Sequence, residues 1–243
     1  MPLPADVSVV IPTYNEAAGI EKLIAAVSGV FRSAGLSAEI VIVDDNSPDG
    51  TGAIVERLAA SYPVRCLHRA GKLGLSSAVI DGWASCAAAI VGVMDADFSH
   101  DPNIAPSLVG AIKNGDCDLA IGSRYVDGGG ITNWPLRRRL TSLVAIALAR
   151  PLTRVKDITS GYFFCKRSVI EGVKLDPIGF KIGLEVIVKG KYKNVQEVPY
   201  VFTDRTHGAS KLNGGEIVNY LKQLGKMYAG GRRQRGNGFG ADA

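Results

Sequence analysis

Three groups of acidic and polar residues follow short apolar segments in the first hundred residues of the chain. They are Pro12–Glu16 (PTYNE), Asp44–Gly50 (DDNSPDG) and Asp95–His100 (DADFSH). In the third group Asp95 and Asp97 are two positions apart, so both carboxylates can face one divalent cation. Mg²⁺ and Mn²⁺ prefer such hard oxygen ligands together with substrate phosphates. Each group alone also suits a solvated turn or a helix cap, but their joint occurrence favours a functional site.

Basic residues form a second group that is suited to phosphates. Arg137–Arg139 lie in a stretch without an acidic residue between Asp127 and Asp157. Guanidinium groups bind phosphate through two hydrogen bonds and remain charged. If the segment is helical, Arg138 and Ser142 are four positions apart and share a face. The alternative is a solvated basic surface.

The apolar segments before the acidic groups are expected to be strands, because they are short and continuously apolar, as in strands covered on both faces. The expected strands of the first half are residues 7–11, 39–43, 64–67, 90–94 and 118–121. Expected helices alternate with them, at residues 17–34, 51–61, 75–88 and 102–114. This order predicts an α/β fold with a mainly parallel central sheet flanked by helices. Ligands of such sheets bind at the carboxyl ends of the strands, where the acidic groups lie.

The second half of the chain is less regular. Three glycines at residues 128–130 are expected to form a flexible connection. The expected helices are residues 135–149, 182–188 and 216–227, and the expected strands are residues 162–166 and 195–201. We expect one catalytic domain at residues 1–229, followed by a flexible basic Gly/Arg-rich tail at residues 230–243.

The expected helix at residues 135–149 carries an apolar stripe with helical spacing. Its members are Leu140, Leu143, Val144, Ala147 and Leu148. Such a stripe can pack on the core, but beside arginines it can also lie at a membrane interface. The sequence leaves both interpretations open.

Composition and charge narrow the function classes. The 243 residues are 47% hydrophobic and 21% charged, a balance typical of a globular protein. Four cysteines without a CxxC pair argue against a zinc or disulfide framework and suit a reducing compartment. The sequence shows no secretory signal and no apolar run of about 20 residues that could span a bilayer. A net charge of +5 is compatible with nucleic acid, anionic lipid or phosphorylated substrates.

Taken together, the motifs resemble the family 2 inverting glycosyltransferases, which have the GT-A (Rossmann-like) fold. This resemblance is carried by Val9–Glu16, Ile42–Ser47 and Asp95–Asp97. Further segments resemble the dolichyl-phosphate mannose synthases within that family, and the resemblance covers residues 7–228. These segments are Asn46–Thr51, Lys72–Leu75, Met94–His100, Gly122–Tyr125, Trp134–Ser142 and Arg205–Lys211.

The resemblance implies a donor site that holds a nucleotide sugar and a divalent metal, Mg²⁺ or Mn²⁺. The implied nucleotide-sugar residues are Pro12, Tyr14, Glu16, Val43, Asp44, Asp45, Asp95, Ala96 and Lys211. The implied metal residues are Asp95, Asp97 and Ser99. Ser99 stands where some relatives have glutamine, so we expect it to act through water. His100 is expected to be an exposed loop histidine.

The resemblance also implies residues that bind the acceptor and support catalysis. The implied acceptor-phosphate residues are Arg124, Arg138 and Ser142, and the implied catalytic residues are Asp97, Arg124, Arg138 and Arg205.

The function implied by the resemblance is inverting transfer of mannose from GDP-mannose to dolichyl or another polyprenyl phosphate, for glycan or lipoglycan assembly. A UDP-glucose-dependent polyprenyl-phosphate glucosyltransferase remains the alternative. Many relatives carry carboxy-terminal membrane helices, which this sequence lacks. We therefore expect a cytoplasmic, peripheral enzyme on the cytosolic face of a membrane, which a small membrane-anchoring protein could assist.

Two other function classes have less support in the sequence. A dinucleotide-dependent oxidoreductase would need a GxGxxG motif after the first strand, and none is present. A non-catalytic nucleic-acid-binding module would suit the positive charge but does not account for acids at three strand ends. We therefore expect no nucleic-acid partner.

Overall fold

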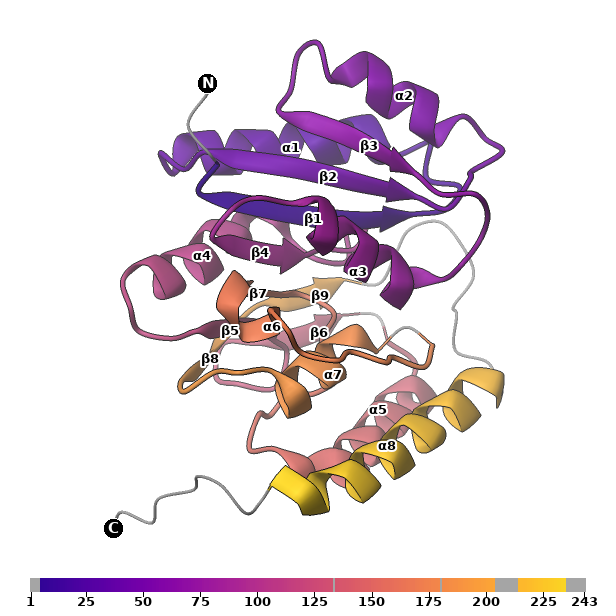
Figure 1. The fold of residues 1–243 in the computed structure, drawn as a ribbon, viewed down its shortest axis with the longest axis vertical. Helices are drawn as coiled ribbons and strands as arrows, with labels where there is room; N and C mark the ends of the chain where they lie inside the picture. The colour runs from indigo at the N-terminus through magenta and orange to yellow at the C-terminus, as the bar shows by residue number, and fades with distance from the viewer. Residues whose placement is uncertain (1–4, 133, 180, 204–213, 235–243) are drawn as a thin grey trace.

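The computed structural model describes residues 5–132, 134–179, 181–203 and 214–234. Its centre is a seven-stranded sheet with the order β3-β2-β1-β4-β7-β5-β8 (Figure 1). The strands are β1 (Val7–Thr13), β2 (Ala38–Asp44), β3 (Val64–His68), β4 (Ile90–Val93), β5 (Leu119–Ser123), β7 (Phe163–Lys166) and β8 (Val195–Pro199). All neighbouring strands are parallel except β7, which is antiparallel to β4 and β5. The predicted mainly parallel sheet is confirmed.

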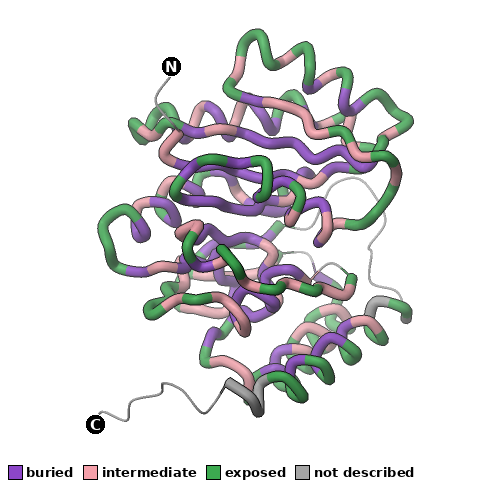
Figure 2. The backbone as a smooth tube through the Cα atoms, viewed as in Figure 1, coloured by how far each residue is buried: buried purple, intermediate pink, exposed green. Residues whose placement is uncertain are grey.

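Helices cover both faces of this sheet. Those of the first half are α1 (Ile20–Ser33), α2 (Thr51–Leu58), α3 (Leu75–Ser85), the 3₁₀-helix η1 (Pro102–Ile104) and α4 (Ala105–Lys113). Successive β1 residues face opposite sides, so Val9 and Ile11 join one apolar cluster with α1 and α4, while Val10 joins a second cluster with α3. Burial on both faces explains why the strands are continuously apolar, and Figure 2 shows the strands as the most buried part of the chain.

The region after β5 differs from the expected pattern. Residues 195–201 do not form one strand, because β8 ends at Pro199 and β9 (Val201–Thr203) pairs with β6 (Gly130–Thr132) in a second, two-stranded sheet. Proline cannot donate a hydrogen bond to a strand ladder, and the next N–H, of Tyr200, donates to the carbonyl of Ser123 (3.1 Å). Gly130 is the first residue of β6. The prediction of a flexible connection at residues 128–130 was therefore wrong at Gly130.

The remaining helices belong to the second half of the chain. They are α5 (Leu136–Ala149), η2 (Arg150–Leu152), α6 (Arg167–Ile170), α7 (Ile182–Lys189) and α8 (Gly214–Gln234). α5 and α8 lie side by side at one end of the molecule, where the hydroxyl of Tyr220 donates to the carbonyl of Ala145 (2.6 Å) (Figure 1). α8 continues four residues beyond the start of the expected tail at residue 230. Residues 235–243 lie outside the described residues.

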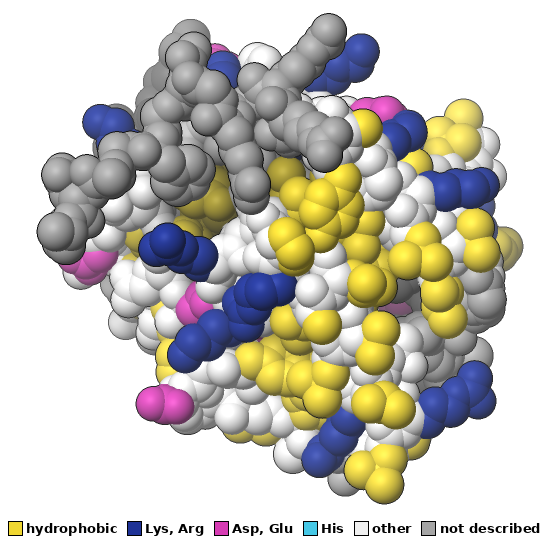
Figure 3. Space-filling view, turned by 90° about the horizontal axis from the view of Figure 1, so that it is seen from below, with side chains coloured by type: hydrophobic (Ala, Val, Ile, Leu, Met, Phe, Trp, Pro, Cys, Tyr) yellow, Lys and Arg dark blue, Asp and Glu magenta, His cyan; other side chains and the backbone are white. Residues whose placement is uncertain are grey.

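The apolar stripe of α5 is exposed and does not pack on the core. All five of its members are exposed, and the buried residues of α5 are Ile146 and Ala149. Exposed apolar residues of α8 extend the same surface: Ile217, Val218, Leu221 and Tyr228. Figure 3 shows apolar side chains gathered on this end of the molecule, with Lys and Arg side chains around them. Among the described residues, no helix has the length and apolar character needed to cross a membrane.

Candidate active site

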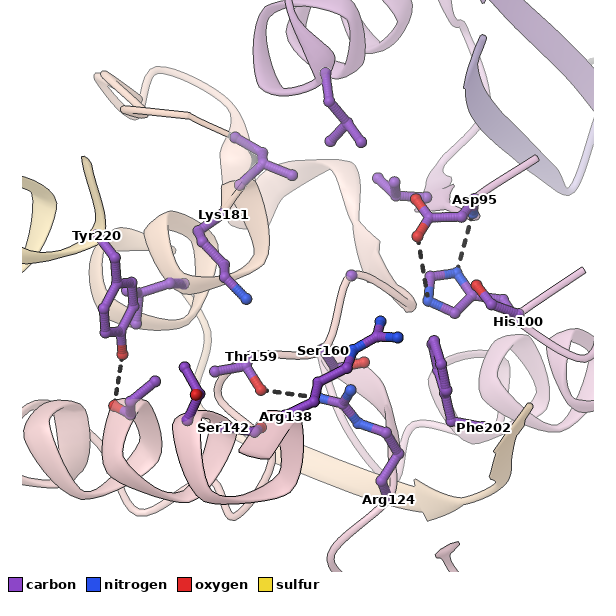
Figure 4. Close-up of a pocket in the computed structure, with 18 of the residues that line it drawn as sticks. Asp95, His100, Arg124, Arg138, Ser142, Thr159, Ser160, Lys181, Phe202 and Tyr220 are labelled. Carbon is purple, nitrogen blue, oxygen red and sulfur yellow. Dashed lines mark hydrogen bonds and ion pairs between the residues drawn. The ribbon is translucent and has the colours of Figure 1, made fainter. Parts of the chain in front are cut away.

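A cavity opens at the carboxyl ends of β1 and β4 and continues between α5, α7 and α8 (Figure 4). Its lining changes along its length, from carboxylates near β4, through guanidinium groups, to aliphatic side chains of the helices. Nine residues predicted from the sequence line it: Pro12, Glu16, Asp95, Ala96, Asp97, Ser99, Arg124, Arg138 and Ser142. The topology therefore brings together most of the predicted donor and acceptor residues.

The acidic part of the cavity is a tight turn after β4. Phe98 has a φ of 58°, a left-handed conformation that is rare for a bulky residue, and Asp97 Oδ1 accepts the Ser99 N–H (3.1 Å). The cap of the following helix η1 is Asp101, which accepts the Asn103 N–H (3.0 Å). Asp95 and Asp97 are therefore not used as helix caps, and both remain partly exposed at the cavity.

This pair of carboxylates fits a hard divalent cation that also binds a substrate. Within the described part of the chain, no third carboxylate, imidazole or thiolate completes a metal cluster with them. Mg²⁺ and similar cations are commonly held by one or two carboxylates, with water and substrate phosphates as the other ligands. Asp95 and Asp97 would supply the carboxylates, and Ser99 is buried within the same turn.

His100 is buried, so the prediction of an exposed loop histidine was wrong. Its ring stacks on Tyr162, with 4.8 Å between centroids and an interplanar angle of 6°, and the edges of Tyr200 and Phe202 surround it. Burial lowers the pKa of His100, although the charge of Asp95 opposes this effect. The side chain is therefore neutral near pH 7, and it belongs to an aromatic cluster that comes from distant parts of the chain.

Arg124, directly after β5, is a buried and fixed charge. Its Nε and Nη2 donate to the two carboxylate oxygens of Asp157, both at 2.7 Å, and Nη2 also donates to Thr159 Oγ1 (2.8 Å). Burial alone would lower the pKa of Arg124, but the charge and hydrogen bonds of Asp157 outweigh it and raise the pKa. Asp157 is fully buried and its N–H donates to Glu197 (2.9 Å), so a network fixes the guanidinium.

Arg138 lies against the same aromatic cluster. Its guanidinium carbon is 4.2 Å from the ring centroid of Trp134, and that of Arg124 is 5.3 Å from the same ring. Arg138 and Ser142 both line the cavity from α5, as their spacing predicted. The hydroxyl of Tyr125 donates to Ser142 Oγ (3.0 Å). Trp134 thus holds two guanidinium groups beside one another at the centre of the cavity.

The predicted residues at the carboxyl end of β2 do not line the cavity. Asp44 accepts hydrogen bonds from Thr13 Oγ1 (3.0 Å) and from the Ser47 N–H (3.0 Å), and Asp45 pairs with Arg69 and accepts the Gly74 N–H (2.9 Å). These two carboxylates therefore fix the loops beside the cavity. Val43 is buried and Tyr14 is exposed beneath the ammonium of Lys72, 3.9 Å from the ring centroid. Arg205 and Lys211 lie outside the described residues.

Sequence reasoning missed several polar residues of this region, among them Lys181, Asp157 and Thr159. Lys181 precedes α7 and its side chain extends into the cavity (Figure 4), but no local motif marks it, because only the packing of α7 brings it there. The sequence did contain a signal for Asp157, because it is the first acidic residue after a long basic stretch. That position could have been used to predict an ion pair with one of the arginines. Thr159 belongs to the same segment and binds Arg124.

Comparisons with known proteins place the chain in a family. The model of the family Glycosyl transferase family 2 matches residues 8–173. The chain is 47% identical over 225 residues to a dolichol-phosphate mannosyltransferase of Pyrococcus furiosus, in a match that covers 91% of this chain and 63% of the relative. It thus spans less than two thirds of that relative's length. It is also 37% identical over 232 residues to a dolichol-phosphate mannosyltransferase of Saccharomyces cerevisiae, and this match covers 91% of this chain and 86% of the relative.

A solved structure shows the same fold. Glucosyl-3-phosphoglycerate synthase from Mycobacterium tuberculosis, in complex with Mn²⁺, UDP and glucosyl-3-phosphoglycerate, superposes with a TM-score of 0.63 and 21% identity. The match covers 92% of this chain and 78% of the other, and confirms the predicted GT-A fold. The chain therefore belongs to glycosyl transferase family 2, as its motifs predicted, and by sequence it groups with relatives named dolichol-phosphate mannosyltransferases.

Proposed function

We propose that this chain transfers mannose from GDP-mannose to the phosphate of dolichol or another polyprenol, with inversion at the anomeric carbon. One observation carries the proposal: a single cavity contains acids suited to a metal–diphosphate, guanidinium groups suited to a phosphate, and an aliphatic wall suited to a lipid. The names of the relatives favour mannose as the sugar and a dolichol phosphate as the acceptor.

The donor belongs at the acidic end of the cavity. Asp95 and Asp97 would hold Mg²⁺ or Mn²⁺, which when bound offsets the charge of the leaving diphosphate. The Mn²⁺ and UDP of the M. tuberculosis structure are in keeping with this chemistry. Pro12 and Glu16 line the cavity beside the acids and would contact the nucleotide. Tyr14, Val43, Asp44, Asp45, Ala96 and Lys211 remain predicted nucleotide-sugar residues, and Arg205 a predicted contact of the leaving diphosphate.

The acceptor phosphate belongs between the acids and the helices. Arg138, Arg124 and Ser142 would hold it there, and Lys181 adds a cation to the same lining. A phosphate monoester has a second pKa near 6, so it is largely dianionic at pH 7 and needs no strong base to activate it. Its oxygen would attack the anomeric carbon. The new carbon–oxygen bond forms as the bond to GDP breaks, and GDP leaves with the electron pair.

The lipid part of the acceptor belongs along α5 and α8. Val144, Leu148, Ile217 and Leu221 line the cavity and are also exposed at the surface. The lining thus continues into the apolar face of the two helices, which suits a polyprenyl chain that remains in a membrane. Arg137 and Arg139 are exposed on α5, and each could add about 1 kcal/mol of attraction to anionic lipid. We propose peripheral attachment to the cytosolic face, with or without a small anchoring protein.

A donor screen tests the proposal. Purified protein is mixed with a short-chain polyprenyl phosphate and either GDP-mannose or UDP-glucose, with Mg²⁺, Mn²⁺ or EDTA. We expect polyprenyl-phospho-mannose from GDP-mannose in the presence of metal and none with EDTA. Turnover of UDP-glucose instead would support the glucosyltransferase alternative. Absence of turnover with both donors in every metal would contradict the proposal.

A further inference from the structure

We propose that His100 is a positioning residue that holds Asp95 in the orientation in which it binds the donor. This inference rests on the donor site proposed above and adds to it a residue that was expected to be an exposed loop histidine. His100 lines the cavity beside Asp95 (Figure 4), and in this inference it acts through that carboxylate.

Two contacts join the imidazole to Asp95. The main-chain N–H of Asp95 donates to His100 Nδ1 at 3.0 Å. Because Nδ1 accepts this bond, the proton of the neutral ring is on Nε2. That nitrogen lies 3.7 Å from Asp95 Oδ2, an electrostatic contact rather than a hydrogen bond. One ring therefore fixes the backbone of Asp95 and places its protonated nitrogen near the carboxylate.

The ring can impose an orientation because it is itself held rigidly. Its side chain is 3% exposed, whereas that of Asp95 is 35% exposed. The parallel stack with Tyr162 fixes the plane of the imidazole, and the edges of Tyr200 and Phe202, with centroids at 6.1 and 6.3 Å, restrict its rotation. The left-handed turn at Phe98 reverses the chain between Asp95 and His100 and so allows this contact across five residues.

A histidine that only filled space in the aromatic cluster would be replaceable by phenylalanine. The two nitrogen contacts predict the opposite. His100→Phe keeps the ring and its stacking but removes both contacts, so the donor affinity should fall while the fold is retained. His100→Asn can place an oxygen near the position of Nδ1 and accept the Asp95 N–H, but it cannot reach the carboxylate. Its effect should therefore be intermediate.

Calorimetry with Mn²⁺ and GDP as the probe separates these possibilities without an activity assay. We expect His100→Phe to raise the Kd of GDP in saturating Mn²⁺ by about 10- to 100-fold, the usual effect of losing an outer-shell partner of a metal-binding carboxylate. His100→Asn should raise it less. The weaker binding of GDP in EDTA should be unchanged in both variants. UDP replaces GDP in the series if the wild type binds only UDP.

Tyr162→Phe is the matched control. It removes the hydrogen bond from the Tyr162 hydroxyl to the carbonyl of Asp101 (2.9 Å) but keeps the ring that stacks on His100. We expect a lower melting temperature and an unchanged Kd.

The outcomes distinguish this inference from the proposed function. If the wild type binds no nucleoside diphosphate in a metal-dependent way, the proposed donor site itself is wrong. If the wild type binds and folded His100→Phe binds equally well, the positioning role is wrong. If His100→Phe does not fold, His100→Asn provides the test. A wild-type Kd of GDP in Mn²⁺ for His100→Asn would contradict the proposed effect of the imidazole on the Asp95 carboxylate.

Discussion

The proposed donor side and the proposed acceptor side of the cavity are built in different ways. Asp95, Asp97 and Ser99 lie within one short turn after β4, so their spacing is set by adjacent residues of the chain. The acceptor side combines Arg124 after β5, Arg138 on α5 and Lys181 before α7, and it depends on Asp157, 33 residues away from Arg124. A change on the donor side should therefore affect chemistry with little loss of stability, whereas a change on the acceptor side should often affect both.

The largest expected effect is on the donor side. Asp97→Ala should lower the transfer rate by about 1000-fold or more, since it removes charge stabilisation of the leaving group. The melting temperature should stay within a few degrees of wild type, because the side chain is partly exposed at the cavity. Rate measurements and thermal melting on the same sample test both statements. Wild-type-like turnover would refute the role of Asp97.

The next largest effect is on the acceptor side and concerns stability. Asp157→Asn leaves Arg124 as a buried charge without its counter-ion, which should lower the free energy of unfolding by about 3–5 kcal/mol. The control is Asp176→Asn, because the pair of Asp176 with Lys226 (2.9 Å) is exposed and should contribute little to stability. Urea denaturation measures both. Equal losses in the two variants would contradict the structural role of the buried pair.

A smaller effect is expected for Arg138, whose replacement should affect the acceptor substrate but not the donor. Arg138→Gln should lower kcat/KM for the polyprenyl phosphate by about 10- to 100-fold, the equivalent of losing a charged hydrogen bond of about 1.5–3 kcal/mol. The affinity for GDP should hardly change. The neighbouring Arg137 is exposed and outside the cavity lining, so Arg137→Gln should leave kcat/KM near wild type in detergent. A loss of GDP affinity in Arg138→Gln would place this arginine on the donor side instead.

The smallest effect concerns the apolar face. Leu140→Ser should weaken binding to anionic lipid vesicles about fivefold, for a loss of about 1 kcal/mol of partial burial. Leu73, which is 61% exposed against 64% for Leu140, lies in the loop before α3, so Leu73→Ser should leave binding unchanged. Vesicle flotation compares the two variants. The same loss in both would show that the face of α5 and α8 has no special contact with lipid.

The contrast between the two sides also explains what the sequence could predict. Continuous apolar runs located β1, β2 and β4, and the parallel order of these strands placed the residues after them on one edge of the sheet. The antiparallel insertion of β7 could not be predicted, because its pairing with β4 and β5 joins segments that are distant in sequence. The division between β8 and β9 was missed for the same reason.

The candidate site shows the same limit at single residues. Arg138 and Ser142 were predictable because four residues separate them on one helix. His100 was not, because its partners Tyr162, Tyr200 and Phe202 come from other strands and loops. Whether the stripe of α5 packs on the core also required the structure, since the periodicity is the same for a buried and an exposed stripe and only the exposure differs.

Calorimetric titration with GDP-mannose tests the proposed metal–diphosphate site most directly. Three titrations suffice: wild type with Mn²⁺, wild type with EDTA, and Asp97→Ala with Mn²⁺. We predict tight binding in the first and a loss of about tenfold or more in affinity in the other two. Equal affinity in all three would mean that the carboxylates after β4 do not hold a metal–diphosphate, and the proposed chemistry would have to be abandoned.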